Sequence, residues 1–209
     1  MTTFASLRSA VADDLERSDL TTQIGTEINN AIREYSRRRF WFSQSRTLTF
    51  STVAAQEFYG TSDSASIPRI VEADKVILTD GSNRYPLCQV DNDTMEMMDT
   101  PSTADNRPTH WAYVQGEIRL WPTPNAVYSI RVTGLIAPEA LSDDSDSNIF
   151  TLNAFDVIRH SARRRVMSNT LKDLEGASVA SEAERAALSS LNTQSVLLMG
   201  RGTIEATDF

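Results

Sequence analysis

The residues of this sequence that come closest to a catalytic arrangement are a carboxylate and an imidazole one helical turn apart. Asp156 precedes His160 by four residues in a segment with helical periodicity. At this spacing an aspartate can orient a histidine ring as a general base, as in a small hydrolase. No nucleophile follows on a recognised elbow motif, and Gly200 and Gly202 do not form a phosphate-binding loop, because no helix is predicted after them. The sequence therefore favours a histidine on a helix surface, with a small hydrolase as an alternative.

Two runs of three arginines are the next candidates for chemistry. Arg37, Arg38 and Arg39 lead directly into three aromatic residues at 40–42, and a second run occupies 163–165. Arginines beside aromatic rings are typical of proteins that stack nucleic-acid bases, so a DNA-binding module is a further alternative. The net charge of -8 opposes it, and three consecutive helical residues spread over about 200° rather than forming one basic stripe. A contact with another protein is the simpler interpretation, since arginine is favoured in interface ion pairs, and aromatics packed in the core are the plainest one.

Metal and redox chemistry have weaker support. Residues 142–148 read Ser-Asp-Asp-Ser-Asp-Ser-Asn, so a calcium ion is conceivable there, but the glycine and terminal glutamate of an EF-hand loop are missing and a solvated loop is favoured. Cys88 is the only cysteine, which excludes an intrachain disulfide, and in a predicted strand it is expected to be a small buried residue. We therefore expect no metal and no cofactor.

Helical periodicity appears at both ends of the chain. Apolar residues recur at three- and four-residue steps from about Phe4, Leu20, Leu152 and Leu171, which predicts one helix pair at each end. The expected N-terminal caps of the first two helices are Thr2 or Thr3, and Asp19, Thr21 or Thr22. The fourth helix is expected to have a break near Gly176 and an apolar stripe through Leu171, Leu174, Ala177 or Val179, Ala183, Ala187 or Leu188, and Leu191.

The middle of the chain has the period of strands. Residues 47–51 and 128–133 alternate between apolar and polar types, and hairpins are predicted over 70–90 and 111–121, the second turning at Gly116. A short helix is expected over 91–98. At least five strands without a long helix between them favour an antiparallel meander or a small sandwich.

These elements predict an α+β fold in which the terminal helix pairs form a four-helix bundle and the β-rich segment is inserted between them. The expected parts are 1–44 and 149–195 for the two helix pairs, 45–148 for the insertion and 196–209 for a flexible C-terminal arm. Phe40 or Trp41 is expected to anchor the chain in the core where it leaves the bundle. No stretch approaches about 18 consecutive apolar residues, so no membrane span is predicted.

Three stretches carry a family resemblance through their order and spacing. They are Ile28–Tyr35 followed by the aromatics at 40–42, Arg107–Tyr113 followed by Gly116–Pro124, and the acidic loop from Leu141 to Asn148 followed by Leu152–Ile158. Together they resemble the head-to-tail adaptor proteins of tailed bacteriophages, of the tail accessory factor type that binds the portal. The likeness covers most of residues 4–195 and carries over no catalytic residue.

The resemblance implies a structural protein of the virion, made in the host cytoplasm and placed at the portal vertex of the capsid. Such adaptors form a homo-oligomeric ring, usually of 12 copies, which binds the portal protein, extends the DNA channel and docks tail proteins of the nozzle or fibre. Packaged DNA passes through without sequence-specific binding. The C-terminal segment of such proteins commonly grips the portal. The residues that we expect to bind the portal or a neighbouring subunit are Arg37, Arg38, Arg39, Met199, Arg201, Ile204 and Phe209.

Overall fold

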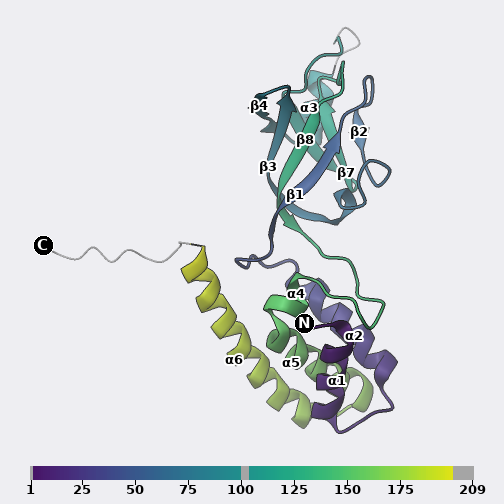
Figure 1. Ribbon diagram of the computed structural model, residues 1–209, viewed down its shortest axis with the longest axis vertical. Helices are drawn as coiled ribbons and strands as arrows, with labels where there is room; N and C mark the ends of the chain where they lie inside the picture. Colours follow the sequence, from purple (N-terminus) through teal and green to yellow (C-terminus); the bar gives the residue numbers. More distant parts are fainter. Residues whose placement is uncertain (1, 100–103, 200–209) are drawn as a thin grey trace, which may run out of the picture. The chain divides into compact units, whose positions relative to one another are not determined.

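The computed structural model describes residues 2–99 and 104–199, and it contains two compact units of different secondary structure (Figure 1). The helical unit comprises residues 1–43 and 138–209, and the β-rich unit comprises residues 44–137. Each unit has a hydrophobic core of its own. The predicted α+β class is therefore confirmed, with the β-rich part inserted between two helical parts of the chain.

Helices α1 (Phe4–Leu15) and α2 (Thr21–Tyr35) form the N-terminal part of the helical unit. The Thr3 hydroxyl accepts a hydrogen bond from the backbone N–H of Ser6, and the Ser6 hydroxyl accepts one from the N–H of Thr3, which is a capping box. The predicted polar cap of α2 is wrong. Leu20 occupies the cap position, and its side chain is buried in the helical core instead of bonding to the first turn.

The C-terminal part of this unit contains α4 (Ile149–Asn153), α5 (Phe155–Val166), a π-helical turn (Met167–Leu171) and α6 (Leu174–Leu198). A single helix was predicted where α4 and α5 lie. They are separate because Ala154 leaves helical geometry, with φ −132° and ψ 29°. Helix α5 is central to the unit, since it contacts α1, α2 and α6.

Helix α6 buries much of the apolar stripe that the sequence predicted, since Ala177 and Leu191 are buried and Ala187 and Leu188 pack against the core. Leu174 is the exception at 74% exposed, and Val179, the alternative to Ala177, is also exposed. The face that is buried carries mostly small or polar side chains, namely Ala177, Ala180, Glu184, Leu191 and Ser195. Small residues let two helices approach closely, so the packing of α6 favours Ala177 over Val179 on the buried face.

The ends of α6 also differ from expectation. Gly176 does not break the helix, because it lies in the first turn, where its N–H donates to Oδ1 of the capping residue Asp173 (2.9 Å). The helix continues to Leu198, with Met199 at its C-cap. Residues 196–198, which we expected to begin a flexible arm, are therefore helical.

The β-rich unit is a sandwich of two four-stranded sheets. Sheet A is antiparallel and has the order β1-β8-β3-β4, with strands Gln44–Ser51, Ser129–Ile136, Ile70–Asp80 and Asn83–Pro86. Sheet B has the order β2-β7-β6-β5, with strands Phe58–Tyr59, Glu117–Trp121, His110–Val114 and Cys88–Gln89. Apolar side chains from both sheets form the core between them, among them Phe50, Val132, Trp111 and Ile118.

Two short helices complete this unit, the 3₁₀ turn Ile67–Arg69 and α3 (Asn92–Met98). The predicted hairpin at Gly116 is confirmed: Gln115 and Gly116 both have positive φ, 52° and 88°, which suits the tight turn between β6 and β7. The hairpin predicted over 70–90 is correct only as far as Pro86, because β5 pairs with β6 of the other sheet, in parallel. Cys88 in β5 is exposed rather than buried, since this strand lies at the edge of sheet B.

Residues 138–148 belong with the helices, although the sequence grouped them with the β-rich insertion. The Asn29 amide donates to the carbonyl of Leu141 and accepts from its N–H, both at 2.9 Å. The backbone N–H groups of Phe4 and Ala5 donate to the carbonyls of Asp146 and Asp144. These bonds satisfy donors that the first turn of α1 leaves free, so the acidic loop is fixed to the start of the chain.

Candidate docking surface

The segment that leaves the helical unit has one buried aromatic residue and one exposed one. Phe40 is 1% exposed and lies in the helical core, where its ring stacks on Phe42 at 5.4 Å and meets Phe150 edge-on at 6.3 Å. Trp41 is 38% exposed. Of the two residues expected to anchor this exit, Phe40 is therefore the anchor and Trp41 is not.

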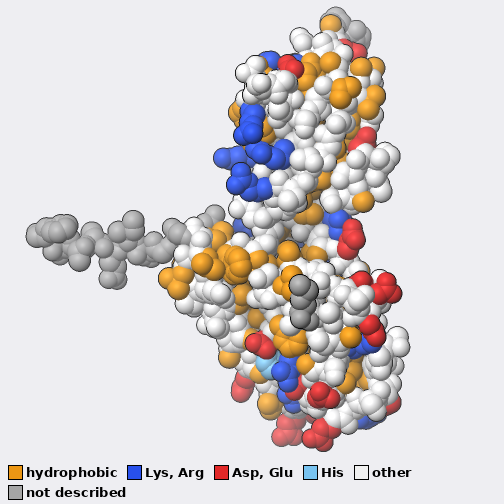
Figure 2. Space-filling model, viewed as in Figure 1, with side chains coloured by type: hydrophobic (Ala, Val, Ile, Leu, Met, Phe, Trp, Pro, Cys, Tyr) orange, Lys and Arg blue, Asp and Glu red, His pale blue; other side chains and the backbone are white. Residues whose placement is uncertain are grey.

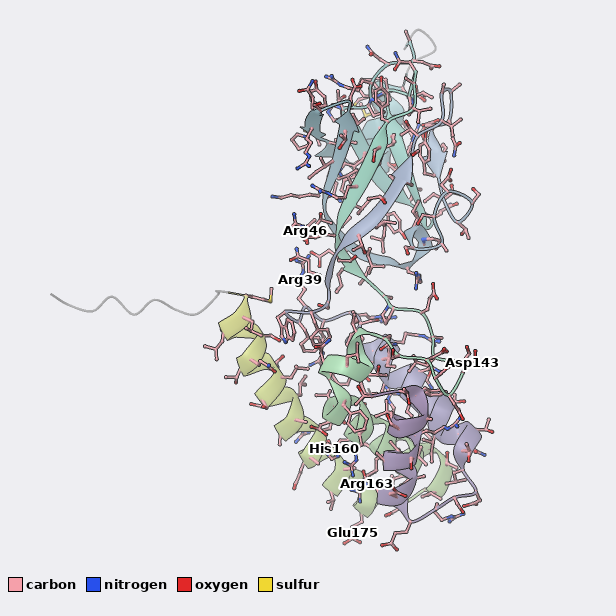
Figure 3. All side chains as sticks on the ribbon, in the orientation of Figure 1. Arg39, Arg46, Asp143, His160, Arg163 and Glu175 are labelled. Carbon is pink, nitrogen blue, oxygen red and sulfur yellow. The ribbon has the colours of Figure 1, made fainter. Side chains whose placement is uncertain are left out.

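The first arginine run divides into residues with different surroundings. Arg37 and Arg38 are exposed, and the guanidinium of Arg38 lies 5.2 Å from the centre of the Tyr35 ring. Arg39, labelled in Figure 3, is half-buried and makes an interaction of its own. Arg37 and Arg38 thus leave charged groups open to solvent, as a contact with another protein requires.

The second arginine run holds the helical unit together. Arg164 Nε donates to Glu184 on α6 at 2.5 Å, and Arg165 pairs with Glu34 and lies 3.8 Å from Glu27, both on α2. These ion pairs tie α5 to the helices on either side of it. The guanidinium groups of Arg164 and Arg165 are thereby engaged within the chain rather than presented as a basic face, which argues against a DNA-binding module.

A buried polar cluster that the sequence did not reveal joins α2, α5 and α6. Glu184 is buried, and its carboxylate accepts hydrogen bonds from the Tyr35 hydroxyl (2.6 Å) and from Arg164. Burial alone would raise the pKa of Glu184, but the bonds from Arg164 and Tyr35 outweigh burial and lower it. Burial and the neighbouring carboxylate also raise the pKa of the Tyr35 hydroxyl. The helical spacing of Glu184 from Ala177, Ala180 and Leu191 is the signal that could have placed it on the buried face.

This cluster predicts an acid-labile helical unit. Because the pKa of Glu184 is lower in the folded protein than in the unfolded chain, its contribution to stability is present above the unfolded pKa and is lost as pH falls through the folded pKa. We expect Glu184→Gln to lower the free energy of unfolding by about 1–3 kcal/mol at pH 7 and to flatten its decline below pH 5. Denaturant unfolding followed by circular dichroism at 222 nm measures both. The control is Glu182→Gln on the exposed face of α6, and an unchanged acid slope in Glu184→Gln would contradict the assignment.

The Asp156–His160 pair of the hydrolase alternative lacks the expected hydrogen bond at Nδ1 of the histidine. Nδ1 of His160 is buried without a hydrogen-bond partner among the described residues, so Asp156 does not orient the ring through that atom. Figure 3 shows His160 on α5 together with Arg163, whose Nε is likewise without a partner in the described part of the chain.

The acidic loop uses its carboxylates for its own structure. Asp146 accepts hydrogen bonds from the N–H groups of Ser142 and Asp143, each at 2.8 Å, and these bonds lower its pKa. Asp144 pairs with Arg8 of α1 at 2.6 Å. Within residues 2–99 and 104–199, no group of three or more His, Cys, Asp or Glu is arranged to hold a metal ion.

The C-terminal end of α6 is an exposed apolar surface. Leu197 is 73% exposed, and Val196 and Leu198 are also open to solvent (Figure 2). A shallow groove of about 490 Å³ runs along the same helix and is lined by Arg185, Leu188, Ser189, Asn192, Thr193, Val196 and Leu197. Apolar side chains gathered in this way on a helix end are typical of a binding surface. Of the arm residues expected to bind the portal, Met199 ends α6, while Arg201, Ile204 and Phe209 lie outside the described residues.

A second cluster unforeseen from the sequence fixes α3 to the outer side of sheet B. The Arg119 side chain is 3% exposed and forms ion pairs with Glu57, Glu96 and Asp99, and it also donates to Asn92 at 3.0 Å. Burial lowers the pKa of this guanidinium, but the hydrogen bonds that it donates to Glu57 and Glu96 outweigh burial and raise the pKa, so the charge is retained. Alternation along β7 could have shown that Arg119 faces away from Ile118 and Leu120, but not that α3 covers it.

The comparison with protein families assigns the chain to the class of adaptor proteins. The chain matches the family model described as SU10 adaptor protein over residues 2–204, and it therefore belongs to this family of phage head-to-tail adaptors. A comparison with curated proteins gives no match. The expected kind of protein, a structural adaptor of a phage virion, is confirmed at this level. No helix within residues 2–99 and 104–199 is long and apolar enough to cross a membrane.

Proposed function

We propose that this protein is a head-to-tail adaptor that binds the portal protein of its phage, extends the DNA channel and docks the tail. The match to the SU10 adaptor protein family over residues 2–204 is the observation that carries the proposal. In this function the copies form a homo-oligomeric ring, 12 in number, at the portal vertex of the virion. Tail proteins of the nozzle or fibre dock below the ring, and the protein needs neither catalysis nor a cofactor.

The helical unit supplies the portal contact in this proposal, as a four-helix bundle of α1, α2, α5 and α6. The apolar end of α6 at Val196–Leu198 leads directly into Met199 and the arm that carries Arg201, Ile204 and Phe209. Such a segment can order on binding and place its apolar residues against the portal. The exposed guanidinium groups of Arg37 and Arg38 add charged contacts to the portal or to a neighbouring subunit.

The proposed passage of DNA requires a surface that does not hold the duplex. The chain carries a net charge of -8, and each unit is net acidic, at -4. A duplex is repelled by net negative charge at short range, so a ring of such copies favours sliding over sequence-specific binding.

Removal of the arm is expected to separate the adaptor from the portal. We predict that the full chain mixed with its portal forms a twelve-fold ring in negative-stain images. Deletion of residues 200–209, or the double substitution Leu197→Asp and Leu198→Asp, should lower portal occupancy at least about tenfold, because the apolar anchor is lost. Native mass spectrometry counts the bound copies.

The matched control is Leu174→Asp, which changes an equally exposed leucine at the other end of α6 and should bind as the unmodified chain does. If the deletion leaves occupancy unchanged, the assignment of the arm is wrong. If the unmodified chain forms no complex with the portal, the adaptor function itself is wrong.

A further inference from the structure

Lys and Arg side chains gather on the outer face of sheet A (Figure 2). The inner face of this sheet carries buried apolar residues of the sandwich core, such as Val76 on β3 and Val132 on β8. Because side chains alternate along a strand, the residues next to them point outward. The outward positions hold Arg131 on β8, Lys75 on β3 and Arg84 on β4. On β1 a register shift between Ser45 and Leu48 interrupts the alternation, and Arg46 within it is exposed. We call these four residues the basic face.

The strand register brings three of these cations together. Lys75 is directly opposite Thr133 of β8. Arg46 lies at the β-bulge of β1 on the other side of the same threonine, between the pairs Ser45–Gly134 and Leu48–Val132. Arg131 is two residues from Thr133 on β8 and therefore points to the same side. Arg46 and Lys75, with β8 between them, are about 10 Å apart at the backbone, and Arg131 is diagonal to each of them at about 7–8 Å, so the three charges share one patch. In the described part of the chain, none of the four cations of the basic face forms an ion pair.

The opposite side of the sandwich is acidic. Helix α3 covers the outer side of sheet B, where Arg119 of β7 binds Glu96 of the helix. Three carboxylates pair with this one guanidinium, from Glu57, Glu96 and Asp99, and α3 carries two further aspartates at its start, the capping residue Asp91 and Asp93. Asp93 is exposed, and Met97, one helical turn further along α3, is 83% exposed. We call Asp93, Glu96 and Met97 the acidic knob.

The two sides match in charge and in apolar content. The basic face contains the half-buried Ile77, which pairs with Arg131 and lies two residues from Lys75 on the same strand face. The acidic knob likewise sets the exposed Met97 among carboxylates. Ion pairs around a small apolar contact are the usual composition of an interface between proteins.

We infer that the basic face of one copy binds the acidic knob of α3 in the next copy around the ring. The inference rests on the proposed ring and adds the contact between neighbouring β-rich units. Because the complementary surfaces lie on opposite sides of one sandwich, the contact is head-to-tail, which is the kind of contact that a cyclic ring repeats between neighbouring copies. A second copy is favoured over duplex DNA as the occupant, because the β-rich unit has seven Lys and Arg against eleven Asp and Glu.

Charge reversal on either side should weaken the ring, and reversal on both sides should restore it. The first variant combines Arg46→Glu with Lys75→Glu, and the second combines Asp93→Lys with Met97→Lys; all four side chains are exposed, so folding is expected to be preserved. Each variant should lower the number of adaptor copies per portal and raise the concentration for half-occupancy about a hundredfold, because like charges then face each other. A variant that carries all four substitutions should recover most of this loss. Native mass spectrometry with the portal gives the copy number, and thermal unfolding checks the fold.

The control variant, Arg17→Glu with Lys172→Glu, changes the net charge by the same amount as the first variant but on the helical unit, and it should assemble normally. If the unmodified chain forms rings and the two reversals do not weaken them, the contact is overturned while the adaptor function stands. If both reversals weaken the ring and the fourfold variant recovers nothing, the pairing of the two surfaces is overturned. If the unmodified chain binds a labelled 30-base-pair duplex and only the first variant loses this binding, the basic face binds DNA and the proposed contact between copies is overturned. Failure of the unmodified chain to bind the portal would overturn the adaptor function and this contact together.

Discussion

Phe40→Ala is expected to destabilise the helical unit by about 3–5 kcal/mol. The ring is 1% exposed and contacts Phe42 and Phe150, so its removal leaves a cavity among aromatic side chains that cannot collapse to fill it. The loss includes two ring–ring contacts, each worth about 0.5–1.5 kcal/mol beyond burial. Phe40 also begins the segment that connects the helical unit to β1, so the cavity should make this segment less well ordered.

Circular dichroism at 222 nm reports mainly on helices. It follows the unfolding of the helical unit selectively, because the α-helix of the β-rich unit, α3, is only seven residues long. Urea unfolding should show an early transition in Phe40→Ala. The matched control is the next residue: Trp41→Ala removes a larger but 38% exposed side chain and should cost about 1 kcal/mol or less. A larger loss in Trp41→Ala than in Phe40→Ala would reverse the roles given to these two rings.

Arg119→Met is expected to cost the β-rich unit about 3 kcal/mol. The methionine fills similar space, but Glu57, Glu96 and Asp99 lose their shared counter-ion and Asn92 loses its donor. These carboxylates are partly exposed and can be hydrated again. The expected loss of stability is therefore near the lower end of the range for breaking a buried ion pair. Helix α3 should then detach from sheet B before the sandwich unfolds.

Tryptophan fluorescence can isolate the β-rich unit. The chain has three tryptophans, and on a Trp41→Phe background only Trp111 and Trp121 remain, both in sheet B. Arg84→Met, which removes an exposed arginine of the same unit, is the control and should change stability by no more than about 0.5 kcal/mol. Equal stability of Arg119→Met and Arg84→Met would show that the ion-pair cluster does not hold α3 in place.

Local patterns were enough for the elements whose signals lie within a few residues. Thr3 caps α1 because a short polar side chain can reach the first turn, and Asp91 caps α3 in the same way. Gly116 marks the β6–β7 turn because few other residues accept a φ of 88°. The order of helices and strands, and the insertion of a β-rich unit between helices, follow from such signals together with the change of period from 3.6 to 2.

Side chains whose place depends on a distant part of the chain could not be assigned in this way. The sequence placed Leu174 in the core and left Ala177 and Val179 as alternatives, whereas α6 buries Ala177, Ala180 and Glu184 and leaves Leu174 and Val179 exposed. Glu184 can be buried only because Arg164 on α5 and Tyr35, 149 positions away on α2, supply its hydrogen bonds. Hydrophobicity read along one helix contains no information about partners on another.

The sequence by itself determined the α+β class, most of the helices and strands, and the kinship with phage adaptors, because these depend on short-range periodicity and on the order of motifs. Only the tertiary structure decided which of two adjacent aromatics is the anchor, which arginine run is engaged in ion pairs within the chain, and which side of the sandwich is basic. Each of these depends on the direction of a side chain relative to a surface built from distant segments. A run such as Arg37–Phe42 presents the same residue types whether its rings are buried or exposed, and the packing of Phe150 against Phe40 makes that choice.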